Sequence, residues 1–89
     1  MEAAFLLKEF ATTYEVTGRN VDGMLREVNR IMDSEQLTME SVHIADADPD
    51  LRMVFSVNGD HQQQNVFSLR LHESTSFASV TTLGTTEHE

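Results

Sequence analysis

Hydrophobic and polar side chains alternate along four stretches of the chain, which is the pattern of a β-strand with one buried face. The stretches are residues 11–17, 37–44, 51–57 and 77–83. β-Branched and aromatic residues are frequent in them, and these side chains suit the surface of a sheet. We therefore predict four strands.

The alternation changes phase within residues 37–44. Leu37 and Met39 alternate in one register, and Val42 and Ile44 alternate in the other. A single extra residue in a strand produces such a change, so we predict a β-bulge near Glu40–Ser41.

Two turn signals bound the third stretch. Residues 45–50 are acidic and contain the single proline, Pro49, and Asn58-Gly59-Asp60 follows the stretch. We predict a hairpin turn over 45–50 and the end of the third strand at Asn58.

A helical period replaces the alternation after Gly23. Five apolar residues then fall on one side of a helix, with charged and amide side chains on the other, so the segment is predicted to be amphipathic. We expect the helix to end near Asp33–Ser34, and either Asn20 or Asp22 to cap its first turn. The apolar stripe consists of Met24, Leu25, Val28, Ile31 and Met32.

Residues 62–74 fit either a strand or a helix. Phe67, Leu69 and Leu71 alternate with polar residues, as in a strand. Phe67 and Leu71 also share one face of a helix, and the glutamines before them weakly favour helix. We choose the helix, because a parallel return to the first strand needs a crossover connection, which is usually helical.

The predicted order is strand, helix, strand, strand, helix, strand. It is the order of the ferredoxin-like α+β fold, in which four antiparallel strands form a sheet with two helices on one face. We expect one domain over residues 1–89. Residues 1–10 are predicted to form a lead-in segment, helical over 3–10, and residues 85–89 a flexible tail.

Charge and composition narrow the function classes. The 89 residues are 39% hydrophobic and carry a formal net charge of −9, with six Lys and Arg against fifteen Asp and Glu. Nucleic acids and anionic membrane surfaces attract clustered cations, so we expect neither as a partner. The longest uninterrupted apolar run, Ala3 to Leu7, is too short to cross a bilayer.

No motif indicates catalysis. The chain has no cysteine, no serine flanked by the glycines of a nucleophile elbow, and no lysine after Gly23 to complete a phosphate loop. The four histidines lack the spacing of a zincin site. We therefore expect no enzymatic activity and no cofactor. The absence of cysteine and of a signal-peptide pattern fits a cytoplasmic protein or the soluble domain of a membrane protein.

Three carboxylates, on Asp46, Asp48 and Asp50, have the opening spacing of a calcium loop. The rest of that motif is missing, because Leu51 stands where glycine is needed and Val57 where glutamate is needed. We interpret the segment as a solvated turn, with these three residues as weak candidates for Mg²⁺ association.

The turn before the first helix carries a family resemblance. Asn20-Val21-Asp22-Gly23-Met24-Leu25 resembles the Asp-x-x-Gly-x-Leu turn of ACT domains, which are ligand-sensing regulatory modules. The strands over 37–44 and 52–57, Leu71 and Val80 also fit the family pattern. The resemblance therefore spans about residues 13–84, with Asn20 standing where the family often has Asp.

The resemblance implies a ligand site at this turn, between two copies packed side by side. Glycine lets a ligand approach the backbone, and a helix N-terminus attracts a carboxylate or phosphate. Asn20 can cap the helix but offers no carboxylate to a ligand ammonium. The implied ligand-binding residues are Asn20, Val21, Asp22, Gly23 and Met24, with Met39 and Ser41 of a neighbouring copy.

ACT-like domains are commonly parts of longer proteins, and the resemblance leaves the parent open. One candidate is an MgtC/SapB-family membrane protein associated with Mg²⁺ transport, of which this would be the cytoplasmic C-terminal domain. The others are a guanosine-tetraphosphate synthetase or hydrolase and an amino-acid-biosynthetic enzyme. The implied partners are a second copy or the parent protein, and the implied ligand is an amino acid or another small anionic molecule.

Two functions remain open at this point. The chain could be a ligand-sensing regulatory domain, with a pocket at Asn20 to Met24. It could instead be a structural interaction module that binds no small molecule and pairs through an exposed edge strand. In that second case Gly23 would only let the turn pass close to the sheet.

Overall fold

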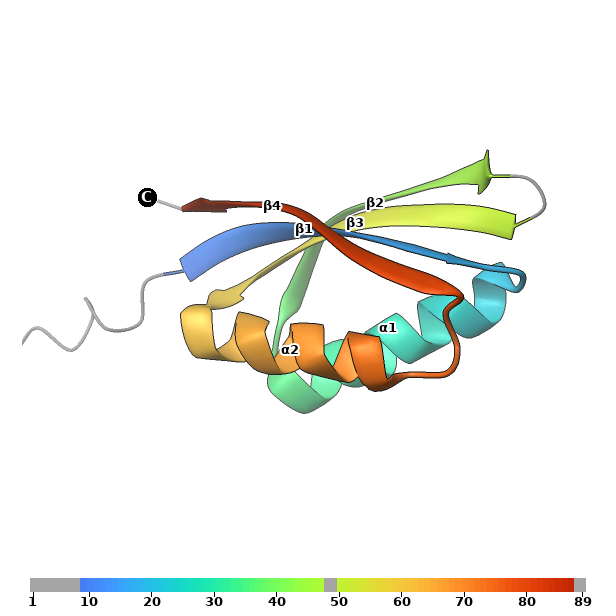
Figure 1. Ribbon diagram of the computed structural model, residues 1–89. Coiled ribbons are helices and arrows are strands. Elements are labelled where there is room, and N and C mark those ends of the chain that lie inside the picture. Colours follow the sequence, from blue (N-terminus) through green and yellow to red (C-terminus); the bar gives the residue numbers. More distant parts are fainter. Residues whose placement is uncertain (1–8, 48–49, 88–89) are drawn as a thin grey trace, which may run out of the picture.

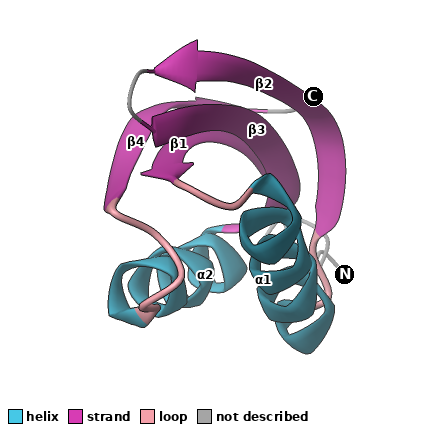
Figure 2. Ribbon diagram, turned by 90° about the vertical axis from the view of Figure 1, so that its right-hand side faces the viewer, coloured by secondary structure: helices cyan, strands magenta, loops and turns pink. Residues whose placement is uncertain are grey.

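The computed structural model describes residues 9–47 and 50–87. Its four strands form one antiparallel sheet in the order β2-β3-β1-β4, and both helices lie on the same face of it (Figure 1 and Figure 2). The predicted ferredoxin-like βαββαβ fold is therefore confirmed. The elements are β1 (Glu9–Gly18), α1 (Val21–Glu35), β2 (Thr38–Ala47), β3 (Asp50–Asp60), α2 (His61–Glu73) and β4 (Ser79–Glu87).

The core lies between the two central strands and the helices. β1 and β3 bury every second side chain, as the alternation predicts. The apolar stripe of α1 packs onto them, with Met24, Val28, Ile31 and Met32 buried and Leu25 half-buried. α2 adds only two buried apolar side chains, Phe67 and Leu71.

The predicted bulge in β2 is confirmed. The pairing of β2 with β3 shifts between Met39 and Ser41, which leaves Glu40 as the extra residue. Met39 lies opposite buried Val57, and Val42 lies opposite buried Phe55. Opposite residues project to the same side of a sheet. The bulge therefore brings both phases of the apolar pattern onto the face that carries the helices.

Residues 61–73 form a helix, which resolves the ambiguous segment. A capping box begins it: Asp60 Oδ1 accepts from Gln63 N at 2.8 Å, and Gln63 Oε1 accepts from Asp60 N at 2.8 Å. The predicted parallel return of the last strand to the first was wrong, since β4 pairs with β1 in the antiparallel sense. The strands that need the crossover are β3 and β4, which run parallel because each is antiparallel to β1.

Several predicted boundaries were wrong. β1 begins at Glu9, so residues 9–10 belong to a strand, and the rest of the lead-in segment lies outside the described residues. β3 continues to Asp60, because β1 keeps pairing with it as far as Glu9. β4 begins at Ser79 and pairs with β1 as far as Glu87, so residues 85–87 are not a tail. The hairpin strands extend to Ala47 and from Asp50, with residues 48–49 outside the described part.

We predict that Gly59→Ala destabilises the fold. A Cβ at this position would overlap Leu37 Cδ2 and lie 3.0 Å from Gln63 Oε1, which belongs to the cap of α2. Overpacking of this kind costs roughly 1–3 kcal/mol in the free energy of unfolding. Urea denaturation followed by circular dichroism measures it. Gly84→Ala is the control, since nothing lies within 4 Å of its Cβ, and we expect a change within about 0.5 kcal/mol. Equal effects of the two substitutions would contradict the packing argument.

Candidate functional site

The turn from β1 into α1 presents backbone donors to solvent. Asn20 caps the helix, because its Oδ1 accepts from Gly23 N at 3.0 Å and its carbonyl oxygen accepts from Met24 N at 2.9 Å. The cap prediction is thereby decided in favour of Asn20 over Asp22. The amides of Val21 and Asp22 precede the first intrahelical bond and have no carbonyl four residues back within the helix. Two N–H groups therefore remain at the positive end of α1.

No close packing requires glycine at position 23. The three atoms nearest to a Cβ there all belong to Asn20, at 3.5–3.7 Å, and the backbone φ is not positive. The close approach occurs instead at Gly18, where a Cβ would lie 2.7 Å from Met24 Sδ and 3.4 Å from Ser76 O. The idea that Gly23 lets the turn pass close to the sheet is therefore not supported.

The predicted site residues do not all face the turn. Asn20 and Asp22 are exposed, and Val21 and Gly23 are half-buried. Met24 is only 1% exposed and belongs to the core, with its N–H already bonded to Asn20. Met24 therefore supports the turn from below, and the surface open to a ligand is formed by residues 20–23.

Met39 and Ser41 lie far from this turn within one chain. Met39 is opposite Val57, which is opposite Thr12, whereas the turn follows Gly18. The six-residue difference along β1 corresponds to about 20 Å. The bulge also turns the two side chains to opposite faces of the sheet, Met39 towards the core and Ser41 to solvent. Only a second copy of the chain could bring either residue to the turn.

Charges of both signs flank the turn. Arg19 precedes it and is largely exposed, with its Nε 3.7 Å from Asp50 Oδ1. The carboxylate of Asp22 stands in the first turn of α1, near the positive end of the helix dipole. The turn thus combines free amides, a cation and a carboxylate within a few residues.

Two of the three weak Mg²⁺ candidates in the acidic hairpin, Asp46 and Asp50, do not share a face of the sheet. Asp46 lies opposite Leu51 and Asp50 opposite Ala47, and side chains alternate along a strand, so the two carboxylates lie on opposite faces. Asp48 is outside the described residues. No group of three or more potential metal ligands occurs within 9–47 and 50–87.

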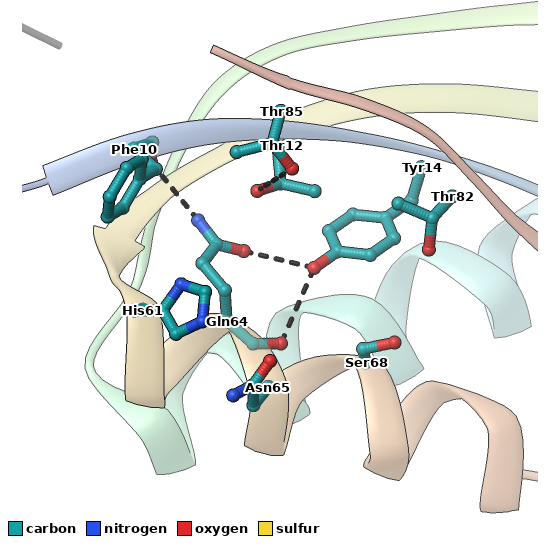
Figure 3. A pocket seen from close by; sticks show the side chains of 9 residues that line it. All are labelled: Phe10, Thr12, Tyr14, His61, Gln64, Asn65, Ser68, Thr82 and Thr85. Atoms are coloured by element: carbon teal, nitrogen blue, oxygen red, sulfur yellow. Dashed lines mark hydrogen bonds between the residues drawn. The ribbon is translucent and has the colours of Figure 1, made fainter. Parts of the chain in front are cut away.

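A pocket that the sequence analysis did not identify lies at the other end of β1. Its volume is about 330 Å³, and it opens between α2 and the end of β4 (Figure 3). Buried Gln64 forms part of its wall. The Gln64 Nε2 donates to the carbonyl oxygens of Phe10 and Val57, at 3.1 and 2.9 Å, and its Oε1 accepts from Tyr14 Oη at 3.0 Å. In the sequence, this region stands out only by the run of glutamines at residues 62–64, and that run was interpreted as weak evidence for a helix.

Comparison with protein-family models and with curated proteins gives no match. Solved structures do match. The ACT domain of a GTP pyrophosphokinase from Chlorobium tepidum superposes with a TM-score of 0.65 at 10% identity, over 84% of this chain and 99% of that domain. The C-terminal domain of MgtC from Mycobacterium tuberculosis gives 0.60 at 10% identity, over 94% and 90%.

A homoserine dehydrogenase from Thiobacillus denitrificans gives a TM-score of 0.70 at 10% identity, over 91% of this chain. The chain spans only 18% of the length of that dehydrogenase. At these low identities the superpositions show the fold alone. The fold is ACT-like, as the sequence resemblance implies. Neither described helix is long and apolar enough to cross a membrane.

Tyr14 gives a direct test of the packing beside the pocket. Burial raises the pKa of its phenol to about 12, against 10.0 for a free side chain. The pKa of Tyr14 is higher in the folded than in the unfolded state, so the buried neutral phenol contributes to the stability of the fold. This contribution is complete below pH 10 and is lost as the pH rises towards 12. A difference of two pKa units between the folded and unfolded states corresponds to roughly 3 kcal/mol in the free energy of unfolding.

Tyr14 is the only tyrosine and the chain has no tryptophan, so ultraviolet absorbance follows its ionisation without interference. We expect the midpoint near pH 12 or at alkaline unfolding, whichever comes first. A midpoint near pH 10 with the far-ultraviolet circular dichroism unchanged would contradict this burial.

Proposed function

We propose that the chain is a regulatory domain that binds a small zwitterionic ligand, such as an amino acid, at residues 20–23. The observation that carries the proposal is Gly23. Glycine inside a helix costs up to about 1 kcal/mol relative to alanine, and no close contact at this position excludes a Cβ. A requirement for ligand access to the backbone would explain why position 23 is a glycine.

The chemistry of the turn suits a zwitterion. The carboxylate of an amino acid would accept from the Val21 and Asp22 amides at the positive end of α1. Its ammonium would pair with the carboxylate of Asp22, since Asn20 offers only an amide whose oxygen is already used by Gly23 N. An anion without an ammonium group would be repelled by the Asp22 carboxylate and would form no ion pair with it, so it should bind less well.

The parent and location are part of the proposal. The likeness to the MgtC C-terminal domain, over most of both chains, supports a cytoplasmic domain of an MgtC/SapB-type membrane protein associated with Mg²⁺ transport. The likeness to the ACT domain of a GTP pyrophosphokinase supports, as the alternative, a guanosine-tetraphosphate synthetase. An amino-acid-biosynthetic enzyme is the third candidate, and the superposition on a homoserine dehydrogenase supports it.

A homodimer through β2 is the second element of the proposal, and it also serves the alternative of a purely structural interaction module. β2 is an edge strand, because among the described strands only β3 lies beside it. Val42 and Ile44 project on the helix-bearing side and are 44% and 42% exposed. A second copy would cover them and could bring its own β2 towards the turn.

Amide chemical shifts of the ¹⁵N-labelled chain test the ligand site. We expect a pool of amino acids to cause saturable shifts at Val21, Asp22 and Gly23, with guanine nucleotides and Mg²⁺ tested separately. A ligand at about a hundred times its Kd should also add roughly 2.7 kcal/mol of stability. Shifts absent from residues 20–23 at millimolar concentration of every compound would refute ligand sensing for these compounds and favour the interaction module.

Gly23→Ala separates binding from folding. The added methyl group has room in the free chain, so stability should be unchanged or higher by up to about 1 kcal/mol. The same methyl group should block the ligand and raise its Kd at least about tenfold. Loss of stability without loss of binding would show that Gly23 serves packing.

Ile44→Lys tests the dimer. A charge in the centre of an apolar seam should convert a dimer into a monomer in sedimentation equilibrium, since an unpaired charge is costly to bury. Leu83→Lys on the other edge strand is the matched control, because Leu83 is exposed to a similar degree. If the dimer survives Ile44→Lys but not Leu83→Lys, the interface lies at β4 and not at β2.

A further inference from the structure

We propose that the pocket between α2 and β4 is a second binding site, for a small uncharged heterocycle with hydrogen-bonding groups on its edge, of the size of nicotinamide or a nucleobase. It goes beyond the proposed ligand site at residues 20–23 and does not depend on it. The two sites lie at opposite ends of β1, roughly 25 Å apart by strand length.

Small polar side chains keep the pocket open. The helix-facing positions of β4 opposite Tyr14 and Thr12 are Thr82 and Thr85. A register shift in the pairing of β1 with β4 makes Leu83 the extra residue, and it is 53% exposed. The large apolar side chain of this segment is thus outside the hollow. Across the pocket α2 presents Asn65 and Ser68 (Figure 3).

The rear wall is fixed before any ligand arrives. Gln64 uses both its N–H groups on the carbonyls of Phe10 and Val57, and its side-chain oxygen on the Tyr14 hydroxyl. Thr12 Oγ1 and Thr85 Oγ1 lie 3.2 Å apart and share a hydrogen bond. Such preorganisation lowers the entropy cost of binding.

Other polar groups at the pocket remain free. The side chains of Asn65, Ser68 and Thr82 have no hydrogen-bond partner among residues 9–47 and 50–87. Each of them can both donate and accept a hydrogen bond. They come from two facing elements, so a ligand between them needs donors and acceptors on both of its edges.

The remaining wall favours a flat ring. Phe10 and His61 contact each other edge to face, with centroids 5.8 Å apart, and both line the pocket. Aromatic faces and edges bind another ring through dispersion and quadrupole interactions. A volume of about 330 Å³ lies at the low end of ligand pockets, which limits the occupant to one ring system.

The lining also favours an uncharged ligand. Among residues 9–47 and 50–87, no Asp, Glu, Lys or Arg lines the pocket, and Tyr14 stays protonated at neutral pH. A charged ligand would lose hydration without meeting a permanently charged side chain of the described lining. The net charge of −9 further disfavours an anion.

Nicotinamide and nicotinate are matched probes, since they share a ring and differ in an amide against a carboxylate. We expect nicotinamide or adenine to cause saturable shifts in the side-chain amides of Gln64 and Asn65 and the backbone amide of Thr82 in the ¹⁵N-labelled chain of residues 1–89. Nicotinate should bind at least about tenfold more weakly. Gly23 should not respond, which distinguishes this site from the one at the turn.

Two variants locate the binding. Thr82→Val removes one hydroxyl at nearly constant shape and should weaken binding roughly five- to tenfold, the effect of one hydrogen bond. Ser68→Leu should fill the pocket and abolish binding. Leu69→Ser, at an exposed position on the same helix that does not line the pocket, should leave binding unchanged.

Three results would overturn the proposal. The first is the absence of saturable shifts at the pocket with either neutral probe at millimolar concentration. The second is equal or tighter binding of nicotinate, or of a polyol such as inositol. The third is retention of full affinity by both Thr82→Val and Ser68→Leu, while the circular dichroism of each variant shows a folded protein.

Discussion

The buried amide of Gln64 holds α2 on the sheet. The helix offers only Phe67 and Leu71 to the apolar core, which is little hydrophobic driving force for thirteen residues. Gln64 bonds to carbonyls of both central strands and to the hydroxyl of Tyr14. A buried polar group that lost any of these partners would destabilise the fold, so the network fixes where the helix can lie.

The polar anchoring of α2 contrasts with the apolar packing of α1. Near α1, the buried side chains are all apolar: Met24, Val28, Ile31 and Met32. Near the start of α2, amide and hydroxyl groups take the place of large apolar side chains, and the strand opposite carries threonines. The helix is held by directional bonds there, so it does not need to close the space against β4.

The two ends of β1 consequently offer different chemistry. One end feeds the capped turn of α1, with free amides, Arg19 and Asp22, and suits a zwitterion. The other end leads into an uncharged pocket with a fixed wall and suits a neutral ring. The two proposed sites would therefore take different ligand classes, and the proposed dimer would use neither of them but the edge strand β2.

The sequence by itself determined the four strands, the first helix and the bulge in β2, because alternation and helical period are local properties. It narrowed the cap to Asn20 or Asp22 and left residues 62–74 between strand and helix, and the structure decided both. It could not show that β1 and β4 stay paired to Glu87, since pairing depends on a strand far away in the chain. It placed Met24 both in the apolar stripe of the helix and in the implied ligand site, and only packing decided for the stripe, whereas no side chain other than Asn20 approaches Gly23. It contained no sign of the pocket, because its lining comes from β1, α2 and β4, and a hollow arises only where their side chains fail to fill the space between them.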